Sequence, residues 1–263
     1  MNKPLISVVT VTFNAGKGLE KTIRSVLEQS YPQVEYLIID GGSTDNTMEI
    51  VARHRDRIAY VVSEKDHGIF DGMNKGILAA KGDYVIMMNA DDAFSDSQVL
   101  ADVARFIEEH PQSDVVFGKA REEREYGFFI VEPDLNSITR KMSISHQAIF
   151  VRTSLLREHL FVVEHRYAAD FEQISGLYLE GHRFAYIDRC IADIVLDGGF
   201  TFKNHIASVN ELYDIRASRG EHIERERRSM IFRKKTVRML KTCLPQPLSR
   251  ALFRFLAKHY KTL

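Results

Sequence analysis

The stretch YVIMMNADDAF, from Tyr84 to Phe94, decides the fold. An apolar run long enough for one buried strand ends at Asn89, and two adjacent carboxylates, Asp91 and Asp92, follow at once. Hard oxygen ligands suit Mg²⁺ or Mn²⁺, and Mg²⁺ is commonly held by one or two carboxylates together with substrate phosphates. The alternative is structural: the two acids form a turn, or an N-cap for a helix that starts near residues 95–97.

Strand and helix patterns alternate on both sides of this stretch. Apolar, β-branched runs predict strands at residues 5–12, 36–39, 58–62 and 114–118, and helical spacing is found at 17–29, around 50–51, after 66 and at 100–107. This alternation favours a parallel, doubly wound sheet with right-handed crossovers, in which ligands bind beyond the carboxyl ends of the strands. The polar clusters at 12–14, 40–45, 66–74 and 89–92 should therefore converge on one crevice.

The second half of the chain is less regular. We expect a strand at 127–132, another at 148–151 directly after Ser145-His146-Gln147, a helix that starts near Asp170 and ends at Gly181, and two short strands at 184–187 and 191–196. The pair Gly198-Gly199 then suggests a mobile loop.

Length and composition predict a soluble globular protein. The chain has 263 residues, of which 44% are hydrophobic and 27% charged, enough for one large α/β domain at 1–202 and a helical extension at 203–263. Cys190 and Cys243 are not spaced as a ligand pair, so neither a disulfide framework nor a zinc site is indicated. No signal-peptide pattern and no apolar stretch of membrane-spanning length is found, so we expect a cytoplasmic protein.

The charge is unevenly distributed although the net charge is zero. The last 42 residues, from His222 onward, carry twelve Lys and Arg against two Glu, a balance of +10 that leaves −10 for the rest. Apolar residues recur among these cations at helical spacing, which is typical of an amphipathic helix at an anionic membrane surface. The alternative, in which the apolar faces pack on the α/β domain, stays open. Aromatic interleaving suited to nucleic acid is missing, so nucleic-acid binding is not expected.

Six segments together resemble the inverting family 2 glycosyltransferases, which have the GT-A fold, a Rossmann-like, mostly parallel central sheet with flanking helices. They are SVVTVTFNAG (Ser7–Gly16), YLIIDGGSTDNT (Tyr36–Thr47), SEKDHGIFDGMNKG (Ser63–Gly76), KGDYVIMMNADD (Lys81–Asp92), SHQAIF (Ser145–Phe150) and YAADFE (Tyr167–Glu172). They cover roughly residues 5–200 in the expected order. The run at 63–76 is similar to the subgroup that builds bacterial exopolysaccharide, colanic acid and lipopolysaccharide O-antigen units.

The resemblance implies a nucleotide-sugar donor, UDP-linked by expectation. It places Thr12, Phe13, Asn14 and Asp40 at the nucleotide base, where an aromatic ring can pack on the base and a carboxylate can accept from a base N–H. The alternatives are a core aromatic for Phe13 and a turn residue for Asp40.

The resemblance also implies a divalent cation, Mn²⁺ or Mg²⁺, on the donor diphosphate. The family's motif is Asp-any-Asp, whereas this chain has Asn89-Ala90-Asp91. Asn89 departs from the usual acid but could still contact the ribose. Asp91 is the preferred metal ligand, and Asp92 either ligates or orients its neighbour.

The catalytic base is expected at the start of the helix after the sheet. An acceptor hydroxyl is a poor nucleophile unless a base takes its proton, and the position that the family fills with Glu-Asp reads Ala169-Asp170 here. Asp170 is the predicted base and Glu172 the second choice; the alternative for Asp170 is a helix N-cap.

Four further residues match family positions. Asp66 and Asn74 correspond to residues near the donor's sugar or diphosphate, and His146 and Gln147 to a motif on the acceptor side. His67 and His146 are more often structural than metal ligands at such positions. The subgroup adds sugars to a polyprenyl diphosphate carrier, so the resemblance implies a lipid-linked glycan acceptor and contact with the inner face of the cell membrane.

The resemblance implies hexosyl or N-acetylhexosaminyl transfer as the activity. The alternative enzyme class is a nucleotidyltransferase on a related sheet, which would prefer a Gly-rich, basic phosphate loop after the first strand. Gly16-Lys17-Gly18 resembles such a loop only weakly. A dinucleotide-dependent oxidoreductase is excluded because no GxGxxG follows that strand. A non-enzymatic sugar- or membrane-binding scaffold stays open because of the departures at Asn89 and Ala169.

Overall fold

The structure is a computed structural model that describes residues 3–124, 127–195, 204–243 and 248. The chain divides into two compact units, Met1–Arg121 with Ile130–Ile194, and Glu122–Phe129 with Val195–Leu263. The first unit contains every residue predicted for the donor, the metal or catalysis. The predicted domain boundary after residue 202 and the predicted mobile loop at Gly198-Gly199 lie outside the described residues.

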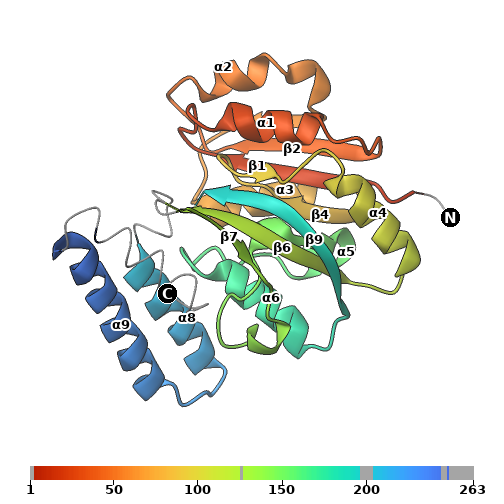
Figure 1. The fold of residues 1–263 in the computed structure, drawn as a ribbon. Helices are drawn as coiled ribbons and strands as arrows, with labels where there is room; N and C mark the ends of the chain where they lie inside the picture. The colour runs from red at the N-terminus through yellow and green to blue at the C-terminus, as the bar shows by residue number, and fades with distance from the viewer. Residues whose placement is uncertain (1–2, 125–126, 196–203, 244–247, 249–263) are drawn as a thin grey trace. The chain divides into compact units, whose positions relative to one another are not determined.

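Within the described residues nine strands form one sheet, in the order β3-β2-β1-β4-β8-β6-β9-β5, with β7 beside β6 (Figure 1). The strands are β1 (Ile6–Thr12), β2 (Val34–Asp40), β3 (Tyr60–Ser63), β4 (Tyr84–Met87), β5 (Ala93–Phe94), β6 (Val115–Arg124), β7 (Gly127–Val131), β8 (Ile149–Arg152) and β9 (Phe184–Val195). The pairs β1/β2, β1/β4 and β2/β3 are parallel, and β8 is antiparallel to both β4 and β6.

The parallel register aligns the polar strand ends. Thr12 at the end of β1 pairs with Asp40 at the end of β2, and Val9 pairs with Met87, so β4 delivers Asn89 and the acids after it to the same edge. The register thus places the clusters at 12–14, 40–45 and 89–92 at one edge of the sheet, and their convergence with 66–74 on one crevice stays a prediction.

Helices pack along the sheet. They are α1 (Leu19–Leu27), α2 (Thr47–Ala52), α3 (Ile69–Ala79), α4 (Val99–Glu109), α5 (Thr153–Glu158) and α6 (Ala169–Leu179), with short 3₁₀ turns η1 (Arg55–Arg57), η2 (Leu135–Ser137) and η3 (His146–Ala148). Strands and helices alternate through the first half of the chain, so the predicted α/β class is confirmed.

Two glycines let α3 lie directly on β1. A Cβ on Gly72 would come within 2.6 Å of Val11 Cγ1, and one on Gly76 within 2.3 Å of Val9 Cγ1, so any side chain there would push the helix away. The close approach buries Met73 and Ile77, each worth roughly 1.5–3 kcal/mol of transfer free energy. The DGMNKG run is therefore first of all a packing motif for the helix that follows β3.

The structure differs from the predicted sheet in its second half. β8 runs antiparallel between β4 and β6, a direction that the alternation of patterns does not predict, although a mostly parallel sheet leaves room for it. Strand β9 is continuous from Phe184 to Val195, although two strands are predicted there, and α5 follows β8 where no helix is predicted. Helix α4 starts at Val99, later than the expected 95–97.

The second unit contains two adjacent helices, α8 (His205–Ser218) and α9 (Glu224–Cys243), joined by a turn at Gly220, whose φ of +84° favours glycine (Figure 1). Arg216 is 3% exposed and donates to Glu221 and Glu226, at 2.8 and 2.9 Å for the closest contacts. Because a buried cation needs carboxylate partners, these ion pairs fix the hairpin. Within the described part of the chain, no helix is long and apolar enough to cross a membrane.

Candidate active site

The Asp40 carboxylate ties together the ends of β1, β2 and β3. Asp40 is fully buried and accepts hydrogen bonds from Thr12 Oγ1 (3.0 Å), Ser63 Oγ (2.6 Å), the N–H groups of Gly42 (3.1 Å) and Ser43 (2.9 Å), and Ser43 Oγ (2.5 Å). Burial raises the pKa of Asp40, but the hydrogen bonds from Ser43, Ser63 and Thr12 outweigh it, so that the pKa lies below its ordinary value. Asp40 thus organises the turn after β2, as its alternative role predicts, and its contact with a base stays a prediction.

Phe13 and Asn14 directly follow β1 and are exposed. The Phe13 side chain is 64% exposed, which excludes the alternative of a core aromatic. Asn14 has a left-handed backbone (φ 49°), its N–H donates to Ser43 Oγ (2.7 Å), and its Oδ1 accepts from the N–H of Thr44 (2.9 Å). These bonds hold the loop so that the Phe13 ring is presented to solvent.

Asp66 and Asn74 lie in different surroundings. A Cβ on Gly41 would come within 2.5 Å of Asp66 Oδ2. Because Gly41 has no side chain, the Asp66 carboxylate can lie against the backbone that follows β2. The Asn74 amide donates to the carbonyl of Phe161 and accepts from its N–H, both at 2.9 Å. Asn74 therefore anchors the segment after α5, and its predicted contact with the donor stays a prediction.

Asp91 lies exposed in the turn after β4, with a left-handed backbone (φ 80°). Its side chain occupies the space over Gly18, since a Cβ on Gly18 would come within 1.1 Å of Asp91 Oδ1. Gly18 immediately precedes α1, whose first N–H groups favour a negative charge nearby. The turn alternative for Asp91 is confirmed, but the N-cap alternative is wrong, because Gln98 precedes α4.

Asp92 is buried and paired. Its side chain is 4% exposed and Oδ2 accepts from Gln147 Nε2 at 2.7 Å, while its carbonyl accepts from Thr22 Oγ1 at 2.6 Å. Gln147 is 7% exposed. This pair links the turn after β4 to η3, so Asp92 serves to orient the turn, and its role as a ligand stays a prediction.

His146 connects the same turn to α6. Its Nδ1 lies 3.3 Å from Asp170 Oδ2, and its Nε2 lies 2.8 Å from Asn89 Nδ2. The contacts fit an imidazole whose Nε2 accepts from the Asn89 amide and whose Nδ1 faces the Asp170 carboxylate. The Asn89 Oδ1 atom is buried without a hydrogen-bond partner.

Asp170 is the second residue of α6. Ala168 occupies the N-cap position, so the N-cap alternative for Asp170 is wrong, and Asp170 Oδ1 instead accepts from the N–H of Phe171 at 2.8 Å. Glu172, the second choice for the base, pairs with His165 at 3.2 Å. The contact with His146 thus distinguishes Asp170 from Glu172.

The described side chains fit a hard divalent cation at the turn after β4. Asp91 supplies an exposed carboxylate, and Asn89, two residues earlier, supplies a buried amide oxygen that lacks a partner. Carboxylate and amide oxygens are the ligands that Mg²⁺ and Mn²⁺ take in proteins. His67 is exposed, and its described contact is a backbone one, N–H to Asp71 Oδ2 (3.0 Å).

Two features of the site are missed by motif reading. The first is Gly18, whose missing side chain leaves space for the Asp91 carboxylate. The second is the pair of contacts that Asn89 and Asp92 make with η3, which join residues more than fifty positions apart. A glycine directly before a helix is the only local signal for the first, and the sequence holds none for the second.

Comparison with known proteins gives the family. The model of "Glycosyl transferase family 2" matches residues 7–155, more than half of the chain. A Mycobacterium bovis protein named "PGL/p-HBAD biosynthesis glycosyltransferase" is 34% identical over 162 residues, which are 59% of this chain and 62% of that protein. The match thus spans about three fifths of the length of this relative and of its Mycobacterium tuberculosis counterpart.

Two solved structures share the fold. S. aureus TarS 1-349 in complex with UDP-GlcNAc is 22% identical, with a TM-score of 0.64, and covers 80% of this chain and 66% of its own. The mannosyltransferase PcManGT from Pyrobaculum calidifontis, in complex with GDP-Man and Mn²⁺, is 17% identical, with a TM-score of 0.66, and covers 98% of this chain and 81% of its own. The two structures show the fold, and the family match over more than half of the chain gives the identification: the chain belongs to glycosyltransferase family 2.

Proposed function

We propose that this protein is an inverting glycosyltransferase that moves one sugar from a nucleotide sugar, UDP-linked by preference, to a lipid-linked glycan acceptor. TarS, a structural neighbour, binds UDP-GlcNAc, and family membership supports the reaction class. The observation that carries the proposal is the contact of His146 with both Asn89 of the turn after β4 and Asp170 of α6. Through this contact the Asp170 carboxylate lies near the turn after β4, which carries the proposed donor and metal residues.

The chemistry follows from these residues. The acceptor hydroxyl attacks the anomeric carbon from the face opposite the diphosphate, a C–O bond forms, and the bond to the diphosphate oxygen breaks. Asp170 takes the hydroxyl proton, a step typically worth about 10²–10⁴-fold in rate. Inversion is the expected outcome because a single in-line displacement occurs.

In this proposal the nucleotide base lies beside Thr12, Phe13 and Asn14. Asp66 lies near the donor diphosphate. Asp91, with the Asn89 amide oxygen, would hold Mn²⁺ or Mg²⁺, which when bound stabilises negative charge on the departing nucleotide. The Mn²⁺ bound to PcManGT supports this choice of cation.

The acceptor and location rest on the second unit. We propose that α9, rich in Lys and Arg, holds the protein at the inner face of the cell membrane during synthesis of exopolysaccharide or O-antigen units. The carrier would be a polyprenyl diphosphate glycan. Nucleic acid is not a proposed partner.

The test is donor binding and sugar transfer in two single variants, Asp91→Asn and Asp170→Asn. Calorimetry with UDP-, GDP- and dTDP-sugars, with and without Mn²⁺, identifies the donor. We expect Asp91→Asn to weaken Mn²⁺-dependent donor binding, and Asp170→Asn to retain binding but lose at least about 100-fold in transfer. Asp188→Asn, an exposed acid at β9, is the matched control and should leave both unchanged.

The outcome separates the remaining alternatives. Wild-type transfer in both variants would contradict the mechanism. Donor binding without transfer to any glycan acceptor by the wild type would favour a binding scaffold, and release of diphosphate from a nucleoside triphosphate would favour a nucleotidyltransferase.

A further inference from the structure

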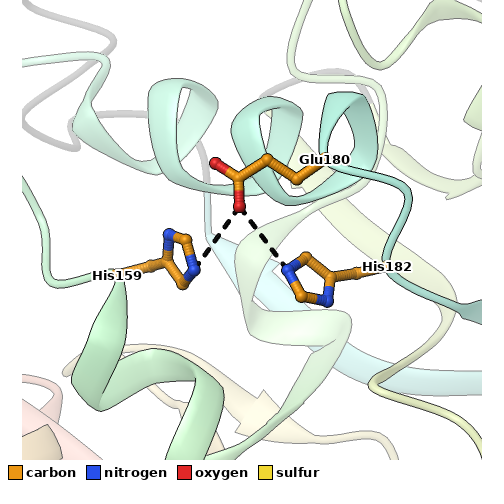
Figure 2. Close-up of side chains that lie close together, drawn as sticks. All are labelled: His159, Glu180 and His182. Carbon is orange, nitrogen blue, oxygen red and sulfur yellow. Dashed lines mark ion pairs between the residues drawn. The ribbon is translucent and has the colours of Figure 1, made fainter.

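A second cluster of metal-ligating side chains lies away from the proposed active site. It consists of His159 directly after α5, Glu180 at the end of α6 and His182 before β9 (Figure 2). Asp170 and Glu180 lie near opposite ends of α6, about 15 Å apart at 1.5 Å per residue. The cluster is thus separate from the turn after β4.

The distances within the cluster are those of metal ligands. Nε2 of His159 and Nε2 of His182 each lie 3.5 Å from Oε2 of Glu180. This is longer than the 2.7–3.2 Å of an N–H···O hydrogen bond. Ligands at about 2.1 Å from a tetrahedral ion are about 3.4 Å apart. Figure 2 shows the carboxylate facing both rings, as a shared cation requires.

The backbone holds two of the three ligands in place. Helix α6 ends in a Schellman motif: the N–H of Gly181 bonds to the carbonyl of Tyr178 at 3.1 Å, and the N–H of His182 to that of Leu177 at 3.2 Å. Gly181 has the left-handed φ of +84° that this motif needs. The motif therefore brings Glu180 and His182, which flank the glycine, to one side of the helix end.

His159 is anchored from its own side of the cluster. Its N–H bonds to the carbonyl of Leu155 (3.1 Å) and its carbonyl accepts from Gln173 Nε2 (2.6 Å), so the backbone is tied to both α5 and α6. All ligand atoms lie within 4.8 Å of one another. The three side chains are 29–51% exposed, which leaves room for the small rotations that bring the two imidazoles closer.

An outer carboxylate completes the arrangement. Nδ1 of His182 lies 3.9 Å from Oδ2 of Asp114, on the side of the ring away from Glu180. A histidine that binds a metal through one nitrogen commonly directs the other toward a carboxylate, which fixes the ring and strengthens the ligand. Asp114 is itself held by Arg183.

We propose that His159, Glu180 and His182 form a binding site for a borderline divalent transition metal, Zn²⁺ foremost, with water in the fourth position. Two imidazoles and one carboxylate suit Zn²⁺ and disfavour Mg²⁺, which prefers an all-oxygen octahedron. Bound metal links the end of α5 to the end of α6. It thereby stabilises the segment between these helices, whose far end leads to Asp170.

The experiment uses the full chain, freed of any histidine tag and dialysed against chelator. Calorimetry and thermal melting with ZnCl₂, and with MgCl₂ for comparison, measure binding. We expect a Zn²⁺-dependent rise in melting temperature that Mg²⁺ does not reproduce, and a visible absorption spectrum of four-coordinate Co²⁺ when Co²⁺ replaces Zn²⁺.

Variants then assign the site. His159→Ala, His182→Ala and the conservative Glu180→Gln should each weaken Zn²⁺ binding by about 100-fold, since even loss of an outer partner costs 10–100-fold. His110→Ala, at the end of α4, and Asp91→Asn, in the proposed donor site, should retain it. Circular dichroism of the metal-free variants checks that they fold.

The proposal is overturned if wild-type protein shows no saturable Zn²⁺ binding, or if the three cluster variants bind Zn²⁺ as tightly as wild type. Loss of Zn²⁺ binding in Asp91→Asn alone would also overturn it. None of these readouts depends on sugar transfer.

Discussion

His146 Nδ1 lies 3.3 Å from Asp170 Oδ2, and this contact joins the 3₁₀ turn before β8 to the first turn of α6. The imidazole is held from its other side by Asn89. A base that must meet a hydroxyl in a fixed direction needs such a partner, because a carboxylate on a helix surface can otherwise rotate freely. His146 is therefore a positioning residue in the proposed mechanism.

Replacing His146 by Ala should lower kcat about 10- to 100-fold, because the Asp170 carboxylate loses the side chain that positions it. KM for the donor should stay within about two-fold, because the lost interaction acts in the transition state and not in the binding of the donor. Steady-state kinetics measure both. His146→Asn, which retains an N–H donor, should recover part of kcat, and equal losses in the Asn and Ala variants would contradict a positioning role.

Gly18→Ala tests the space that Asp91 occupies. A Cβ there would come within 1.1 Å of Asp91 Oδ1, so the carboxylate must move, and we expect Mn²⁺-dependent donor binding to weaken about ten-fold or more. The backbone of Gly18 is right-handed, so the free energy of unfolding should change by less than about 1 kcal/mol. Gly176→Ala, which has open space around its Cβ, is the control. Unchanged donor binding in Gly18→Ala would argue against Asp91 as a ligand.

Asp40→Asn should destabilise the protein by about 3 kcal/mol near neutral pH, because an amide cannot accept all the hydrogen bonds that the buried carboxylate accepts. The folded-state pKa of Asp40 lies below its ordinary value of 3.8. The stabilisation is therefore complete above pH 3.8 and is lost as the pH falls through the lower folded value. Urea unfolding near neutral pH and at about pH 3 measures the free energy of unfolding of both proteins. The difference between wild type and variant should become smaller at the acidic pH. A gap that persists there would point to packing instead.

Asn74→Ala should lower the free energy of unfolding by about 2–4 kcal/mol, since the N–H and carbonyl of Phe161 both lose a buried partner. Proteolysis should become faster between residues 159 and 168. Asn136→Ala, at an exposed position in η2, should change stability by no more than about 0.5 kcal/mol. If donor affinity falls while stability does not, Asn74 contacts the donor as the family resemblance implies.

The first half of the fold is predictable because its signals are local. Residues 6–12 and 34–40 are apolar runs that end in polar residues, and helical spacing marks α1, α3 and α4. The antiparallel β8 is not predictable in this way, because periodicity reports burial and says nothing about the direction of a strand. The length of β9 is not predictable from periodicity either, because polar residues such as Asp188 interrupt the apolar pattern without ending the strand.

The site is predictable as a set of residues but not as a set of contacts. Motif positions predict Asn89, Asp91 and Asp170 for the site, and their roles stay predictions. What the sequence does not contain is that Asn89 reaches His146, that Asp92 is buried against Gln147, and that Asp40 is enclosed by donors. These depend on tertiary packing between segments 23 to 57 residues apart, and the departure at Asn89 can be weighed only once these contacts are known.

Vesicle binding tests the role of α9. Phe232 and Met239 are 74% and 58% exposed on a helix that also carries the exposed cations Arg233 and Lys235. We expect the protein to sediment with vesicles containing phosphatidylglycerol and not with pure phosphatidylcholine. Each cation contributes about 1 kcal/mol at such a surface, so the double variant Arg233→Glu/Lys235→Glu should bind at least about 30-fold more weakly.

The matched control is Lys81→Glu/Lys141→Glu, which reverses two exposed charges in the first unit. It changes the net charge by the same amount, so a loss of vesicle binding limited to the α9 variant identifies the helix as the contact. Equal losses in both variants would indicate a non-specific effect of charge. No sedimentation of the wild type would favour the alternative in which the apolar residues of the extension pack on protein.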